Sequence, residues 1–119
     1  MATQEQVRVF LNEFFSKKKV YNIEFRNDRG KNVQALFDFE LTPMQREGIV
    51  DSLKAEDYYR GPLADDLNKK ENMWEFGKVW RGNEIYIKIT MGAYSKPVVC
   101  ISFHSPERKM ILPYKKSKS

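Results

Sequence analysis

The chain contains one cysteine and one histidine, Cys100 and His104, and both lie in the stretch VVCISFHSPERK. An unperturbed histidine titrates near pH 6.5, so it can donate a proton when charged and accept one when neutral. His104 ends a strand-like run, and we interpret it as a candidate general acid or phosphate ligand. Cys100 lies in mid-strand and is more typical of a small packing residue than of a nucleophile. This pair makes no Cys/His zinc cluster, so we predict no metal and no cofactor.

Four more residues could contribute chemistry on the same surface as His104. Side chains alternate across a strand, and the predicted strands put a carboxylate, a phenol, an ammonium and a hydroxyl on the face of the imidazole. These residues are Glu75, Tyr86, Lys88 and Ser102. One face of an antiparallel sheet is usually solvated, so an ordinary polar face remains the alternative interpretation.

The face assignment depends on three strands in the last third of the chain. MWEFGKVWR, EIYIKIT and KPVVCISFH each read as a strand of an antiparallel sheet made largely from residues 73–104. Gly82-Asn83, between the first two, has the glycine of a two-residue type II′ hairpin. That turn pairs Val79 with Tyr86, and by extension Gly77 with Lys88 and Glu75 with Thr90.

The opposite face of this sheet is apolar and should pack on helices. It collects Ile85, Ile87 and Ile89, with Trp74, Phe76, Trp80, Val99, Ile101 and Phe103 beside them. Lys78 also falls on this side, and an edge position or a bulge at Gly77 would relieve the conflict.

Helices are predicted in the first half of the chain. Val7, Phe10, Leu11, Phe14 and Phe15 recur at helical spacing within residues 5–19. A second helix begins at Thr42 with Pro43 in its first position. Its buried stripe is Ile49, Val50 and Leu53, and the residues expected to point outward are Arg46, Glu47 and Asp51.

Residues 32–41 fit a strand or a helix, and we favour a helix because Asn32 is a good N-cap. VYNIEF, before it, alternates like a short strand, and RNDRGK is a polar turn. AEDYYRGPLADDLNKKEN reads as a long polar connection of a length that is often functional. Residues 106–119 read as a basic, frayed tail.

Composition and length favour one soluble domain. The 119 residues are 41% hydrophobic and 31% charged, and we expect a single α+β domain over 1–119, with its N-terminal helices packed on one face of a mainly antiparallel sheet. No run approaches a membrane span, and MATQEQVRVF lacks the pattern of a signal peptide. A lone cysteine suits a reducing cytoplasm. The net charge of +5 favours a polyanionic partner, above all nucleic acid.

Three segments resemble a known family when they are taken together. LKAEDYYRGP, MWEFGKVWRGNEIYIKIT and VVCISFH occur in the order and spacing of the MqsR-like toxins of bacterial toxin–antitoxin systems, and the likeness covers roughly residues 30 to 105. The resemblance implies a RelE-like fold, messenger-RNA endoribonuclease activity and a cognate antitoxin, which we expect to carry a helix-turn-helix domain. At the family's catalytic positions this chain has Arg60 for lysine, Glu75 for glutamine and His104 for lysine, while Tyr86 is shared.

These substitutions are compatible with a metal-free ribonuclease. Such cleavage uses the 2′-hydroxyl of the RNA as nucleophile and needs a base, a cation near the phosphorus and an acid for the leaving oxygen. Glu75 as base and His104 as acid fit these roles, with Tyr86 and Arg60 as further catalytic candidates. Lys88, Arg81 and Ser102 are the predicted RNA-binding residues. A catalytically inactive module that binds RNA or protein through the same surface is the competing hypothesis.

Overall fold

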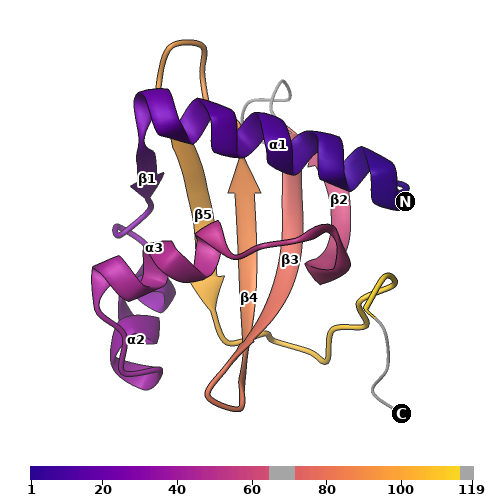
Figure 1. Ribbon diagram of the computed structural model, residues 1–119. Coiled ribbons are helices and arrows are strands. Elements are labelled where there is room, and N and C mark those ends of the chain that lie inside the picture. The colour runs from indigo at the N-terminus through magenta and orange to yellow at the C-terminus, as the bar shows by residue number, and fades with distance from the viewer. Residues whose placement is uncertain (65–71, 116–119) are drawn as a thin grey trace.

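The computed structural model describes residues 1–64 and 72–115 and has the α+β fold that the sequence predicts. Helices pack on one face of a five-stranded sheet of order β1-β5-β4-β3-β2, in which only the β1–β5 pair is parallel (Figure 1). The elements are α1 (Gln4–Tyr21), β1 (Ile23–Phe25), α2 (Gly30–Asp38), α3 (Pro43–Asp51), a 3₁₀ turn η1 (Ala55–Asp57), β2 (Tyr58–Ala64), β3 (Asn72–Trp80), β4 (Asn83–Thr90) and β5 (Val98–His104).

Helix α1 crosses the sheet and covers its apolar face (Figure 1). It begins with a capping box, in which the Thr3 hydroxyl accepts from the Gln6 N–H and the Gln6 side chain accepts from the Thr3 N–H. Its apolar stripe is buried as predicted, except that Phe15 is only partly buried, and the Phe10 ring stacks on Trp74 with centroids 4.4 Å apart. This stripe forms the core together with the isoleucines of β4.

Residues 32–41 are mostly helical, which confirms the favoured alternative, but the predicted N-cap was wrong. Arg29 is the N-cap of α2, and Asn32 lies buried inside the helix. The Asn32 amide donates to the carbonyl oxygens of Arg26 and Ile101, each at 2.9 Å, and its oxygen accepts from the Phe103 N–H at 3.0 Å. Asn32 therefore fastens α2 to β5 instead of starting the helix.

Helix α3 begins as predicted, with Thr42 as N-cap and Pro43 in the first turn. Ile49 and Val50 are buried, but the outward placement of Arg46 was wrong, because this residue is only 3% exposed. Its guanidinium lies 3.9 Å from the centroid of the Phe25 ring and donates to the Asn27 side chain at 2.9 Å. The planar cation can be buried here because an aromatic face and an amide oxygen partly replace water.

The β3–β4 turn differs from the predicted type II′ turn at Gly82-Asn83. Trp80 pairs with Asn83, so the central turn residues are Arg81 and Gly82, with φ of 49° and 81°. Positive φ at both positions is the pattern of a type I′ turn, which matches the twist of the strands. The pairing shifts by two residues, so that Glu75 lies opposite Lys88 and Gly77 opposite Tyr86. A shift of two leaves every side chain on its predicted face.

A bulge in β5 corrects the predicted apolar face. Lys88 pairs with Ser102 but Ile89 pairs with Cys100, so Ile101 is the extra residue. Phe103 faces the core as predicted, whereas Val98 and Cys100 replace Val99 and Ile101 in the core cluster.

Part of the predicted polar connection is in fact the edge strand β2. Pro62 has no N–H to donate, and an edge strand tolerates such a residue. The pairing of β2 with β3 shifts register on both sides of Arg60, so the strand is irregular at this point. Residues 65–71 of that connection lie outside the described residues.

The segment after β5 is packed, which corrects the predicted frayed tail for residues 106–115. Met110 is buried against Gly77, where a Cβ would lie 2.9 Å from the Met110 Cε. Tyr114 stacks on Tyr58 at 5.7 Å, and its hydroxyl donates to the Ala2 carbonyl oxygen. Residues 116–119 lie outside the described residues.

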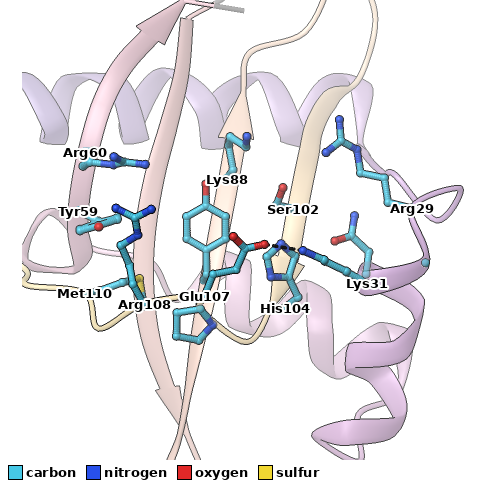
Figure 2. Close-up of a pocket in the computed structure, with 14 residues that line it drawn as sticks. Arg29, Lys31, Tyr59, Arg60, Lys88, Ser102, His104, Glu107, Arg108 and Met110 are labelled. Carbon is cyan, nitrogen blue, oxygen red and sulfur yellow. Dashed lines mark hydrogen bonds and ion pairs between the residues drawn. The ribbon is translucent and has the colours of Figure 1, made fainter.

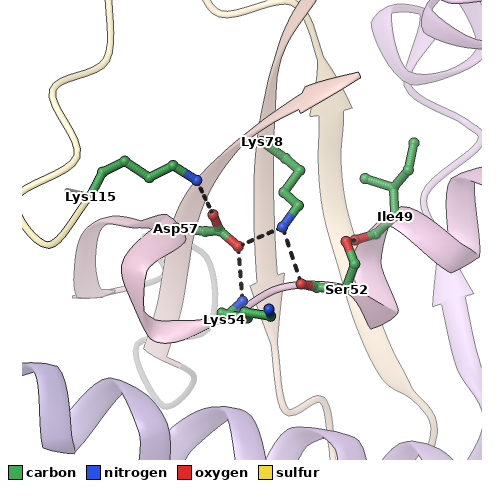
Figure 3. A network of polar contacts seen from close by, with 6 residues as sticks. All are labelled: Ile49, Ser52, Lys54, Asp57, Lys78 and Lys115. Carbon is green, nitrogen blue, oxygen red and sulfur yellow. Dashed lines mark hydrogen bonds and ion pairs between the residues drawn. The ribbon is translucent and has the colours of Figure 1, made fainter. Parts of the chain in front are cut away.

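A buried carboxylate explains how Lys78 is accommodated on the apolar side (Figure 3). Asp57 is fully buried and accepts from the Lys54 N–H at 2.9 Å and from Lys78 Nζ at 3.0 Å. Lys115 Nζ donates to its other oxygen at 3.2 Å, and Lys78 also donates to the Ser52 carbonyl oxygen at 3.2 Å. The network joins η1, β3 and the C-terminal segment.

Within residues 1–64 and 72–115, no helix is long and apolar enough to cross a membrane.

Asp57→Ala should lower the free energy of unfolding by about 3–5 kcal/mol, because it leaves Lys78 charged without its buried partner. Lys115→Ala, which removes a half-exposed partner of the same carboxylate, should cost less than about 1 kcal/mol. Urea denaturation followed by circular dichroism measures both values. Equal losses in the two variants would contradict the assigned role of Asp57.

Candidate functional site

The polar face of the sheet, opposite α1, carries a cleft of about 460 Å³ (Figure 2). Its floor is Tyr86 and Lys88 of β4 with Ser102 and His104 of β5. One wall comes from β2, the other from the first turn of α2, and the segment after β5 closes one end. The wall residues with charged or aromatic side chains are Tyr59, Arg60, Arg29, Lys31, Glu107 and Arg108.

The strand register places the floor residues in two cross-strand rows. Arg60 pairs with Glu75, Glu75 with Lys88 and Lys88 with Ser102, which makes one row across four strands. Tyr86 pairs with His104 in the next row, with ring centroids 5.2 Å apart. Directly opposed side chains on one face lie close enough to contact one ligand.

Glu75 lies at the centre of the first row and is 2% exposed. Arg60 Nε donates to one carboxylate oxygen at 2.6 Å, and the Tyr86 hydroxyl donates to the other. The hydrogen bond to Glu75 raises the pKa of Arg60, so the Arg60 guanidinium stays protonated. Burial, followed by the bond to Glu75, raises the pKa of the Tyr86 phenol above its ordinary value. Glu75 therefore holds a cation and a neutral phenol side by side at the cleft.

The orientation of His104 follows from one backbone contact. Its Nδ1 lies 2.8 Å from the carbonyl oxygen of Ser105. A carbonyl can only accept, so Nδ1 carries the proton in this contact. Nε2 is then the ring atom that can take a proton from a ligand or give one to it.

The structure brings six of the seven predicted site residues together. Arg60, Tyr86, Lys88, Ser102 and His104 line the cleft, and Glu75 lies beneath Arg60 and Tyr86. Arg81 is not among the lining residues. It lies in the β3–β4 turn, and its guanidinium is 5.1 Å from the Trp80 ring centroid.

Sequence reasoning missed the cationic walls of the cleft. Arg29 and Lys31 belong to RNDRGK, which was assigned to a turn, and Arg108 lies in the segment assigned to a frayed tail. Their basic character was visible, but nothing local showed that these segments return to the sheet. Lys31 forms an ion pair with Glu107 across the cleft, so one wall cation is partly balanced. The lining still has more cations than anions, which favours an anionic ligand.

Cys100 behaves as the packing residue that the sequence predicts. Burial raises the pKa of its thiol to about 12, so it is not a thiolate at neutral pH. Among residues 1–64 and 72–115, no three His, Cys, Asp or Glu side chains converge as a metal site would require.

A second cavity, of about 730 Å³, lies between α1 and the strands on the other face. Its charged lining residues among those described are Glu5 and Glu13, and apolar groups such as Val9 and Trp74 line the rest. Its acidic rim disfavours the anionic ligands that suit the first cleft.

Comparisons of the chain with family models, with curated proteins and with solved structures find no match.

Native wild type and Tyr86→Phe should show the same tyrosinate absorbance at about pH 11, because the raised pKa keeps Tyr86 neutral there. After unfolding in urea at the same pH, the two should differ by one of the six tyrosines. Absorbance at the tyrosinate band measures both, with circular dichroism to verify the native state. A difference of one tyrosinate between the native proteins would show that Tyr86 ionises normally.

Proposed function

We propose that the protein is a toxin-type, metal-independent endoribonuclease of the RelE-like, MqsR-like class, which cleaves messenger RNA in the cytoplasm. The observation that carries the proposal is the meeting of His104, Tyr86, Arg60 and Lys88 at one cationic cleft. These side chains supply proton transfer and charge stabilisation for phosphodiester cleavage by the 2′-hydroxyl of the RNA.

Arg60 and Lys88 hold the scissile phosphate. The two residues flank Glu75 in the same cross-strand row, so their side chains approach one phosphate from either side. Arginine offers a planar fork of donors and lysine a compact charge, and both are suited to phosphate oxygens. As negative charge builds on these oxygens during attack, fixed cations stabilise it without reorganisation.

His104 protonates the leaving 5′-oxygen through Nε2. The contact of Nδ1 with the Ser105 carbonyl fixes the ring, and the imidazolium form donates when the P–O bond breaks. The products are a 2′,3′-cyclic phosphate and a 5′-hydroxyl.

Glu75 acts as base through Tyr86. The buried carboxylate cannot reach a substrate hydroxyl directly, because Arg60 and Tyr86 cover it. Tyr86 lines the cleft, so its oxygen accepts the 2′-hydroxyl proton while its own proton moves to Glu75. A phenol with a raised pKa remains protonated and so retains the proton that this relay passes on.

A cognate antitoxin with a helix-turn-helix domain is part of the proposal, since an unrestrained messenger ribonuclease is harmful to its cell. The inactive binding module remains the competing function. The first of the following experiments separates the two, and the second tests whether the cleft binds RNA.

His104→Ala should lower cleavage of single-stranded RNA by about 10²-fold or more, because it removes the proton donor. The fold should be retained, since His104 is a partly exposed residue at a strand end. The assay follows RNA by gel and identifies the cyclic phosphate end, with a chelator present to show metal independence. Equal rates for the two proteins would exclude His104 from catalysis, and RNA binding without any cleavage would favour the inactive module.

RNA affinity should fall steeply with salt, and Arg60→Ala or Lys88→Ala should each flatten the log–log salt slope by about one unit. Arg81→Ala is the matched control, because this arginine lies in the distant turn and should leave the slope unchanged. Fluorescence anisotropy at several salt concentrations gives the slopes. If all three variants behaved alike, the cleft would not be the RNA site.

A further inference from the structure

The first turn of α2 presents free backbone donors at the cleft. Arg29, Gly30 and Lys31 all line it, and Arg29 caps the helix without a side-chain hydrogen bond. Among the described residues, the N–H groups of Gly30 and Lys31 have no acceptor. The first N–H groups of a helix point outward from its N-terminus, where the helix dipole also favours an anion.

Ser102 provides a second and independent sign of a ligand. The residue is 3% exposed, yet it lines the cleft, where Figure 2 shows it between Lys88 and Arg29. Its hydroxyl has no hydrogen-bond partner within the described part of the chain. Among the described residues, the fully enclosed side-chain polar atoms without a partner are Arg46 Nε and Trp80 Nε1, so the Ser102 hydroxyl is instead reached from the cleft and can donate to a ligand oxygen there.

Asn32 places this hydroxyl beside the helix end. Its side chain bonds to the Ile101 carbonyl oxygen and to the Phe103 N–H, the two residues that flank Ser102. The first turn of α2 and the Ser102 hydroxyl are thus fixed relative to each other before any ligand binds, which lowers the entropy cost of binding.

Ser102 lies at the end of the cross-strand row, one strand beyond Lys88, and so to one side of the position between Arg60 and Lys88 that is assigned to the scissile phosphate. Arg60 and Ser102 stand in one cross-strand row with three strand intervals between them, or roughly 14 Å at about 4.8 Å per interval. A phosphate centred between Arg60 and Lys88 therefore leaves the Ser102 end of the row open to a neighbouring phosphate.

We propose that the Gly30 and Lys31 N–H groups, the Ser102 hydroxyl and the Arg29 guanidinium form a second phosphate subsite. It rests on the proposed function and holds a phosphodiester next to the one that is cleaved. The substrate is therefore a single-stranded RNA that continues past the scissile bond, and a mononucleotide fills only part of the cleft.

Gly30→Pro tests the subsite with Gly30→Ala as its matched control. Gly30 is the first helical residue, where proline is accommodated, and Arg29 has the extended φ of −88° and ψ of 118° that a following proline requires. Proline removes one N–H, whereas alanine keeps it and meets no atom within 4 Å. Ser102→Ala removes the hydroxyl independently.

The probe is a fluorescein-labelled, 2′-O-methyl RNA of mixed sequence, which cannot be cleaved, and the readout is anisotropy. Gly30→Ala should bind like wild type, and Gly30→Pro and Ser102→Ala should each bind about tenfold more weakly, with unchanged circular dichroism. If Gly30→Pro does not fold, the comparison of Ser102→Ala with wild type decides.

The outcomes distinguish the subsite from the nuclease. Affinities of folded Gly30→Pro and Ser102→Ala equal to that of Gly30→Ala would overturn the subsite and leave the nuclease proposal standing. The expected loss of affinity, combined with no cleavage of ordinary RNA by wild type, would support the subsite and overturn the nuclease. Absence of RNA binding by wild type would overturn both.

Discussion

The packing of α1 against the isoleucine row of β4 is the constraint on which the rest of the molecule depends. Ile85, Ile87 and Ile89 are completely buried in the core that they share with the α1 stripe, and each contributes about 1.5–3 kcal/mol of hydrophobic stabilisation. Because strand side chains alternate, burying this row fixes Tyr86 and Lys88 on the other face. The core and the cleft are therefore two results of one register, and a slip by one residue would destroy both.

Two buried carboxylates, one on each side of the sheet, each bind side chains from two different segments of the chain. Asp57 on the helix side binds lysines from β3 and from the C-terminal segment, while Glu75 on the cleft side binds Arg60 and Tyr86. Removing such a charge from water is costly, and its partners offset that cost only when the geometry is held. Asp57 fastens the fold at a distance from the cleft, whereas Glu75 fixes the relative position of two residues that line the cleft.

The sequence was sufficient for those features that depend on local pattern. The α1 stripe, the Thr42-Pro43 start of α3 and the alternation of β4 need only neighbours within one element, and all are present. The β5 bulge, the burial of Arg46 and the return of residues 106–115 depend on contacts between distant segments. The same limit explains the site, where the floor residues on the strands were found and Arg29, Lys31 and Arg108 were missed.

The parallel pairing of β1 with β5 determines when the cleft can exist during synthesis. The two strands lie near opposite ends of the described chain, and the closure of so long a loop costs entropy before any pairing compensates it. The cleft also needs α2, which Asn32 attaches to β5, and residues that follow β5. A nascent chain that is still waiting for its last strand on the ribosome therefore has no complete cleft. The cleft can form only after β5 and the segment that follows it have been synthesised.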